Sequence, residues 1–397
     1  MVSKAENKPL NKPVFFELGF RPFFFGAGIF SVIAMLAWMA VLVFSVPLIL
    51  PGLAPGAWHA HEMVYGYAMA VVAGFLLTAV VNWTGVESLN GRALAVLFLL
   101  WLLARVAYFL PFESALLLSA GADSLFLLGL ALGVSRPVMR VKQWKQMGLV
   151  SKLWLLIVTN GLFYAGALGY LEQGMTWGIY AGLYLILGLL FTLARRVIPF
   201  FIGRGVDEDF SPRNHQWIDV ASPLLFSVWA ILDIFTQQEM LVAWFSILQL
   251  CLHAWRMRGW YTPGLWSKPL LWSLYIGYGF LPLGFMLKAF SIWWSVAPDL
   301  ALHAFVVGGV GLMTIGMMSR VSWGHTGRNI ALPPRIVAPI FLLILLSALF
   351  RVVVPVLDSV HLWSTVLAQA AWILGFSLFV MVYFPVLTSP RVDQPPS

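Results

Sequence analysis

Twelve stretches of about 20 predominantly apolar residues follow one another along the 397-residue chain, and this pattern limits the possible folds most strongly. An α-helix of about 20 residues crosses the roughly 30 Å hydrocarbon layer of a bilayer. Composition agrees, because 61% of the residues are hydrophobic and only 10% are charged. We therefore predict an all-α integral membrane protein, a single bundle of about 12 transmembrane helices. The expected spans are 23–45, 61–82, 93–112, 115–134, 151–171, 176–202, 217–236, 240–256, 270–290, 297–320, 334–355 and 361–386.

Basic residues indicate how this bundle is oriented. With the N-terminus inside, only Arg105, Lys288 and Arg351 of the 24 Lys and Arg residues fall in the outer half. Cytoplasmic segments of membrane proteins are enriched in Lys and Arg, so both termini are expected in the cytoplasm. The net charge of +8 follows from this topology and does not indicate a nucleic-acid partner. We expect a short cytoplasmic N-terminal segment (1–22), retained because no signal cleavage site follows it. A transmembrane domain (23–386) in contact with membrane lipid and a cytoplasmic tail (387–397) are expected to follow.

The seven histidines fall into two layers across the predicted membrane. Ionisable side chains in hydrocarbon are costly, so each of them requires a partner or a function. The outer layer holds His59, His61, His303 and His361. The inner layer holds His215, His253 and His325. His215 is expected to be solvated and His361 to lie at the interface.

The sequence WHAHEM at 58–63 is the most informative motif of the outer layer. On a helix, His59 and His61 point about 200° apart, so one helix can offer an imidazole to each of two centres. Neutral imidazole binds haem iron and copper. His303, followed by a glycine-rich face, is a third candidate ligand. Because the chain has no C-x-x-C-H motif, any haem would be haem b. The alternative is that these histidines are interfacial and bond to carbonyls or lipid headgroups.

Three further observations concern the candidate sites. Glu62 can relay protons to an outer site, although a glutamate at a helix start also matches the helix dipole. His253 and His325 could form a second metal site or a quinone site, or simply contact headgroups beside neighbouring arginines. Arg105 and Asp123 lie at equal depths of roughly 10–12 Å on two antiparallel helices and are expected to meet. Their pair either neutralises two buried charges or lets Arg105 hold a haem propionate or another anion.

One internal similarity links the two outer motifs. Residues 61–85 align with residues 303–327 without gaps, pairing His61 with His303 and Gly85 with Gly327. Both segments end in a Thr-Gly turn. We expect His61 and His303 to lie at similar depths.

Four separated motifs resemble those of the NnrS family of bacterial inner-membrane proteins. They are ELGFRPFF (17–24), WHAHEM with AGFLLTAVVNWTG (58–85), RRVIPFF (195–201) and HAFVVGGVGLMTIGMMSRVSWGHTGR (303–328). The resemblance covers nearly the whole chain. It implies a twelve-helix protein that contains haem and copper and takes part in the response to nitric oxide and nitrosative stress.

The resemblance also implies a set of site residues. The family's signature histidines correspond to His59, His61, His303 and His325, with His253 a weaker match. Its signature arginines correspond to Arg21, Arg320 and Arg328. Val86 stands where a basic residue is expected, a departure that affects no ligand.

The resulting hypothesis is an outer centre of haem b with copper or a second haem, held by His59, His61 and His303. Such a centre would reduce nitric oxide to nitrous oxide with electrons from quinol. The alternatives are a non-enzymatic haem protein that binds nitric oxide or metal, and a transporter of copper or small molecules. Haem-copper enzymes use a His-x-His helix in a comparable way, which is an analogy only.

Overall fold

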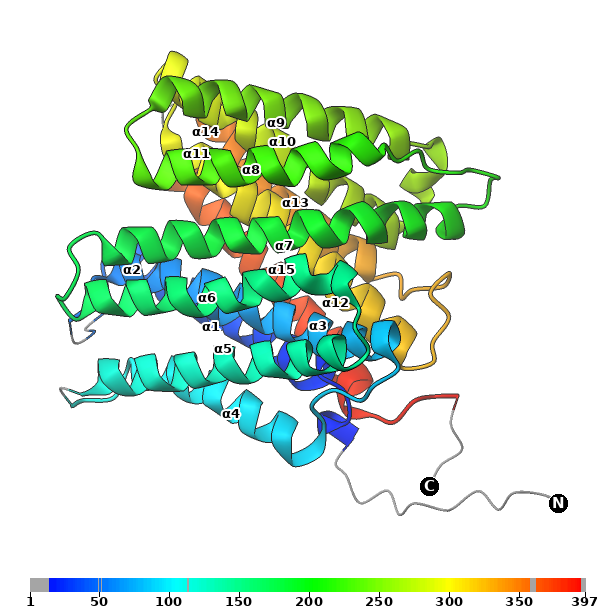
Figure 1. The fold of residues 1–397 in the computed structure, drawn as a ribbon, viewed down its shortest axis with the longest axis horizontal. Coiled ribbons are helices and arrows are strands. Elements are labelled where there is room, and N and C mark those ends of the chain that lie inside the picture. The colour runs from blue at the N-terminus through cyan, green and yellow to red at the C-terminus, as the bar shows by residue number, and fades with distance from the viewer. Residues whose placement is uncertain (1–13, 49, 51, 113, 358–361, 394–397) are drawn as a thin grey trace.

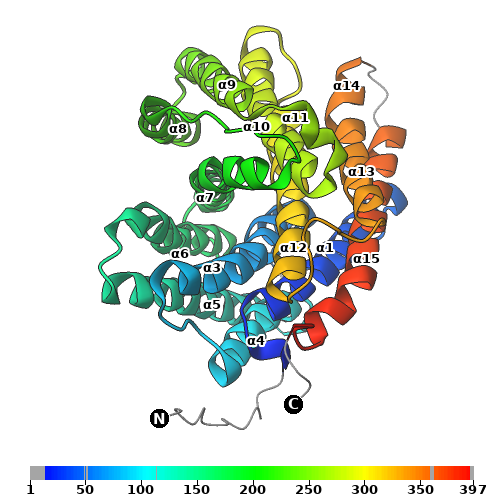
Figure 2. The ribbon, with the colours of Figure 1, turned by 90° about the vertical axis from the view of Figure 1, so that its right-hand side faces the viewer.

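The protein is a bundle of roughly parallel helices in the computed structural model, which describes residues 14–48, 50, 52–112, 114–357 and 362–393. These residues contain helices and no strand. In Figure 1 the long helices run side by side along the longest axis, and Figure 2 views them end-on. His361, predicted at the interface, lies outside the described residues.

Twelve continuous helical rods account for the twelve predicted spans. Nine are unbroken α-helices or begin with a short 3-10 turn: α1 (Phe20–Phe44), α4 (Gly91–Ala107), α5 (Ala115–Arg140), α6 (Met147–Ala167), α7 (Gly174–Gly205), α8 (Gln216–Phe235), α9 (Glu239–Trp260), α10 (Pro269–Trp293) and α15 (Leu362–Thr388). Three contain a π-helical segment: α2 (Pro55–His61) with η2 (Glu62–Ala68) and α3 (Met69–Thr84), α11 (Pro298–His303) with η5 (Ala304–Gly311) and α12 (Leu312–His325), and α13 (Val337–Ala348) with η6 (Leu349–Val353) and α14 (Val354–Leu357).

Eleven of these rods are long and apolar enough to cross a membrane, and the twelfth, α4, has 17 residues. The prediction of a multi-pass, all-helical membrane protein is confirmed. The third predicted span was wrong at its outer end, because α4 stops at Ala107 rather than at 112. Pro111 follows in the turn, and proline cannot continue a helix. α5 is longer than predicted and reaches Arg140.

The first and last helical rods of the described chain, α1 and α15, meet at one end of the bundle. Arg21 at the start of α1 donates from Nη1 to the carbonyls of Leu387 and Ser389 at the end of α15, at 2.9 and 2.7 Å. These carbonyls lack partners within their own helix, so the arginine caps them. Both chain ends therefore reach the same face of the bundle.

The two segments that align in sequence follow the same course in the structure. Each begins with a short helix opened by proline, ends that helix at His61 or His303, and continues through a π-helix into a longer α-helix. Thr84 and Thr326 each donate to the carbonyl four residues earlier, at 2.7 Å. The chain then leaves the helix through glycine at φ 67° (Gly85) and 80° (Gly327), a conformation that favours glycine.

Helices α6 and α7 approach each other backbone to backbone. A Cβ added at Gly178 would lie 2.5 Å from the backbone nitrogen of Phe163, and one at Gly174 would lie 2.5 Å from the carbonyl oxygen of Leu162. Gly174, Gly178 and Gly182 are spaced four residues apart on one face of α7. This small-residue stripe is typical of close helix pairs in membranes.

Gly178→Ala is therefore expected to lower the stability of the protein by about 1–3 kcal/mol, because backbone atoms of α6 cannot yield to a new methyl group. Gly161→Ala on α6 is the matched control, since nothing lies within 4 Å of its added Cβ. The check is the temperature at which the detergent-solubilised variants lose helical structure. Equal temperatures for the two variants would contradict the close approach.

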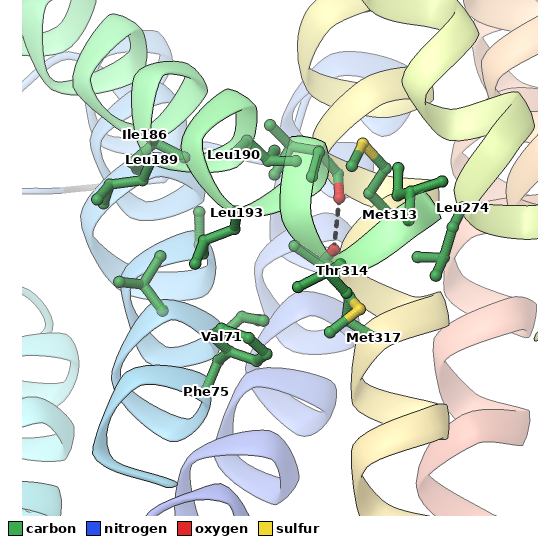
Figure 3. Close-up of a pocket in the computed structure, with 16 residues that line it drawn as sticks. Val71, Phe75, Ile186, Leu189, Leu190, Leu193, Leu274, Met313, Thr314 and Met317 are labelled. Atoms are coloured by element: carbon green, nitrogen blue, oxygen red, sulfur yellow. Dashed lines mark hydrogen bonds between the residues drawn. The ribbon is translucent and has the colours of Figure 1, made fainter. Parts of the chain in front are cut away.

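A half-open apolar pocket of about 80 Å³ lies between α3, α7 and α12. Figure 3 shows its lining of aliphatic, phenylalanine and methionine side chains. Thr314 is the polar residue of the lining, and its hydroxyl donates to the Val310 carbonyl at 2.6 Å, the bond drawn in Figure 3. The lining offers few hydrogen-bonding groups to a bound molecule.

Candidate functional site at the outer histidines

His59 and His61 point to different sides of α2, as their spacing predicts. The His59 ring stacks on Trp38 of α1, with ring centroids 4.6 Å apart and an interplanar angle of 7°. The His61 ring faces α4, α5 and α6 and stacks on Phe163 at 4.1 Å. The helix therefore presents its two imidazoles to two separate environments.

His61 is fully buried, and both of its ring nitrogens have protein partners. Nδ1 lies 3.0 Å from Glu62 Oε1 and 3.2 Å from the Tyr108 hydroxyl, and Nε2 lies 2.9 Å from Asn160 Oδ1. A metal ligand needs a free nitrogen lone pair. The assignment of His61 as a ligand stays a prediction, and it would require His61 to give up one of these contacts.

Arg105 stands at the centre of the same buried polar network. Its Nε lies 2.7 Å from Glu62 Oε2, and its Nη2 lies 2.8 Å from Asp123 Oδ2. All three side chains are almost completely buried. The structure thus brings Arg105 and Asp123 together as predicted, and adds Glu62 to the pair. Arg105 already directs Nε and Nη2 at carboxylates, so its proposed contact with a propionate stays a prediction.

Tyrosine, serine and asparagine side chains complete this network. The Tyr164 hydroxyl lies 2.8 Å from that of Tyr108 and donates to Asp123 Oδ2 at 3.2 Å. Ser119 lies 3.0 Å from Tyr164 and donates to the Ala104 carbonyl. Because charges in a low-dielectric interior interact strongly, such a connected network holds its members in fixed positions.

His303 is arranged differently from His61. Its Nδ1–H donates to the Asp299 carbonyl one turn earlier, at 2.6 Å, which leaves Nε2 as the acceptor nitrogen. Histidines that bind metals commonly donate their second ring N–H to a carbonyl in this way. His59 Nδ1 is buried and has no hydrogen-bond partner in the described part of the chain. The charges of His59, His303 and Arg351 lie close enough to interact.

Arg351 and Asp299 connect the helices around this pair of histidines. Arg351 Nη2 lies 2.9 Å from Asp299 Oδ2 and joins η6 to α11. All three π-helices of the described chain flank this outer region: η2 follows His61, η5 follows His303 and η6 contains Arg351. π-helical segments are rare and often occur at functional sites. We define His59, His303, Trp38, Asp299 and Arg351 as the outer histidine site.

His253 occupies a second, closed network in α9. Its Nδ1 lies 2.5 Å from the Tyr278 hydroxyl and its Nε2 lies 3.2 Å from the Ser222 hydroxyl. Arg256 joins Tyr278 to Asp219, with an ion pair of 2.9 Å to the latter. Both ring nitrogens are thus engaged, and the metal assignment of His253 stays a prediction.

The predicted inner residues Arg21, Arg320, His325 and Arg328 lie near the opposite end of the bundle from His303. Arg320 covers the Phe201 ring at 3.8 Å, which joins α12 to α7. The His325 ring lies 5.8 Å from Phe20 and is half-buried. These contacts bring segments of three separated sequence motifs together, but they do not place His325 in the outer histidine site.

Several residues of these sites were missed by the sequence analysis. Arg351 was counted only as evidence of topology, although an arginine inside an apolar stretch is itself a signal. Asn160 in the fifth span was a comparable signal, because a buried amide needs partners. Trp38 and Asp299 gave no such signal, since tryptophan and aspartate near span ends are ordinary.

The donor set can be compared with the metals that the resemblance implies. No group of three or more His, Cys, Asp or Glu side chains that could hold a metal occurs among the residues the structure describes. His59 and His303 nevertheless fit as two imidazole ligands, because each has a ring nitrogen available. One or two imidazoles would be sufficient to hold a haem iron, whereas protein copper sites commonly use more donors.

The fold and the outer histidine site define a multi-pass helical membrane protein with two available imidazoles at one end of its bundle. The chain belongs to the NnrS family: the family profile, described as NnrS protein, matches residues 14–391. This family is associated with the response to nitric oxide. No curated protein matches the chain.

Proposed function

We propose that this protein handles nitric oxide at a metal centre held by His59 and His303, and that it reduces nitric oxide to nitrous oxide with electrons from quinol. The observation that carries the proposal is the contrast between the histidines: His61 and His253 are enclosed by hydrogen bonds, whereas His59 and His303 each keep a nitrogen available. A bound haem b, alone or with copper, would supply a site that binds nitric oxide and exchanges electrons.

The chain itself fixes the two imidazoles. The Asp299 carbonyl holds the Nδ1–H tautomer of His303 and so directs Nε2 away from the α11 backbone. Trp38 fixes the plane of the His59 ring by stacking. The ion pair between Arg351 and Asp299 ties η6 to α11, so the site draws on four helical rods.

Protons are the second requirement of the proposed reaction, in which two nitric oxide molecules, two electrons and two protons give nitrous oxide and water. Glu62 lies three residues after His59 and shares a hydrogen bond with His61. We propose that Glu62 delivers protons from this network toward the outer site. The apolar pocket between α3, α7 and α12 is compatible with a small gas such as nitric oxide.

A protective haem protein that only binds nitric oxide is the second candidate, because His59 and His303 would hold a haem equally well in a protein without turnover. A copper transporter is less well supported, since the described residues offer no group of three metal-binding side chains.

Turnover distinguishes these candidates. The full-length protein, purified from membranes, is assayed for haem and copper per chain, and nitric oxide is then followed with an electrode after a reduced quinol analogue is added. We expect consumption of many equivalents per chain, with nitrous oxide as the product. Loss of about one equivalent with a haem spectral shift would instead establish a binding protein. A preparation that retains haem, binds no nitric oxide and moves copper across vesicle membranes would overturn both the reductase and the binding protein.

A further inference from the structure

Arg21 is a fully buried arginine, and three of its five N–H groups have no partner among the described residues. Nη1 caps α15 through Leu387 and Ser389, but Nε and Nη2 have no partner among the described residues. A buried cationic group with unsatisfied N–H groups is costly in a membrane protein. These N–H groups therefore require an acceptor that the described side chains do not provide.

The unused atoms form one edge of the guanidinium. Nε–H and one Nη2–H point in the same direction, and this fork matches two oxygens of one carboxylate or phosphate group. Because Nη1 is fixed on the α15 carbonyls, the fork cannot turn away from its position. The geometry selects a ligand with two acceptor oxygens.

The surrounding charges also favour an anion. Arg328 and Arg391 lie close enough to Arg21 for their charges to repel it, and Glu17 is the acidic group near it. Asp393 is occupied by Arg391, with contacts of 3.0 and 2.7 Å. Arg328 Nη1 is likewise buried without a partner in the described ranges. Three arginines thus face two carboxylates, and one of these carboxylates is already paired.

Three chain segments build this position. They are the start of α1, the end of α12 with the turn that follows it, and the end of α15. The last two are joined directly, because Val392 N–H donates to the Thr326 carbonyl at 3.1 Å and Arg391 Nη1 to the His325 carbonyl at 3.2 Å. The position is thus near the ends of the helices, where lipid headgroups lie.

We propose that Arg21, assisted by Arg328, binds a two-oxygen anionic group carried by a membrane amphiphile. A phospholipid phosphate and the carboxylate of a bound prosthetic group share this chemistry. The site is near the opposite end of the rod α11–η5–α12 from His303, so it goes beyond the proposed reaction and does not depend on it.

The test measures binding of phosphatidylglycerol and phosphatidylcholine to the full-length protein by native mass spectrometry, with haem per chain measured in the same preparations. The variants are Arg21→Lys, Arg328→Gln and Glu17→Gln. Arg21→Lys keeps a cation that can cap α15 but loses the fork. We expect the wild-type preference for phosphatidylglycerol to fall by about tenfold in Arg21→Lys, because a charge-assisted bidentate contact is lost.

The other variants keep the proposal falsifiable if Arg21→Lys folds poorly. Arg328→Gln leaves the cap of α15 intact and should weaken binding of phosphatidylglycerol. Glu17→Gln removes a negative charge that repels the anionic lipid and should strengthen its binding. If Arg21→Lys and Arg328→Gln lower haem content and leave lipid preference unchanged, the anion is the carboxylate of the prosthetic group. Folded variants with unchanged lipid preference and unchanged haem content would overturn the proposal.

Discussion

Replacing His303 with alanine is expected to remove the bound metal cofactor and nitric oxide consumption together. The imidazole is one of two that the outer histidine site offers, and its Nδ1–H is already oriented by the Asp299 carbonyl. Loss of a residue that only supports a ligand costs about 10–100-fold in metal affinity, so loss of a ligand should cost at least about 100-fold. The measurement is haem, copper and iron per chain, with the haem spectrum and nitric oxide consumption of the same preparation.

Two comparisons make this result specific to the outer histidine site. His59→Ala should lose the cofactor as His303→Ala does, because its unpartnered Nδ1 is the second available nitrogen. His215→Ala, at the N-terminal cap of α8, should retain both cofactor and activity. If His303→Ala and His59→Ala keep full cofactor content while His61→Ala loses it, the ligand is His61 and the outer histidine site as defined here is wrong.

A large loss of stability is expected from Arg105→Met, which removes the cation between two buried carboxylates. Glu62 and Asp123 would then lie in the bundle without a positive partner. Breaking one side of a buried ion pair costs about 3–5 kcal/mol, because the remaining charge is uncompensated. We expect a marked fall in the temperature at which the solubilised protein loses helical structure. Arg92→Met on the same helix is the control, since Arg92 is exposed.

Removing the two carboxylate charges as well should restore much of the stability that Arg105→Met loses. In the triple variant Arg105→Met with Glu62→Gln and Asp123→Asn, no uncompensated charge is left in the network. We expect the triple variant to be more stable than Arg105→Met alone. A triple variant that is less stable than the single variant would show that hydrogen bonding, rather than charge, is what Arg105 contributes.

Sequence patterns predicted most of the fold. Twelve hydrophobic stretches became twelve helical rods, and the meeting of Arg105 with Asp123 followed from depth on two neighbouring antiparallel helices. The opposite directions of His59 and His61 followed from helical periodicity alone. The errors were local, as in α4, where a proline in the turn shortened the predicted span.

The sequence pattern could not predict which histidine has a ring nitrogen available to bind a metal. His61 and His303 align in sequence and each precedes a π-helix, yet one is enclosed and the other is not. The partner that encloses His61 Nε2 is Asn160, 99 residues away on α6, and the ring that orients His59 is Trp38 on α1. Arg21 likewise meets residues of α15 more than 300 positions away.

The sequence by itself determined the class of protein, the number of helical rods and the candidate residues, because hydrophobicity and bilayer thickness act on each segment separately. Only the tertiary structure decided which nitrogen of which histidine is available, and which arginine retains an unused edge. Hydrogen bonds and ion pairs in a low-dielectric interior depend on distances of a few ångströms between helices far apart in the chain. Those distances are set by packing between the helices, and the hydrophobic pattern of a single segment does not contain them.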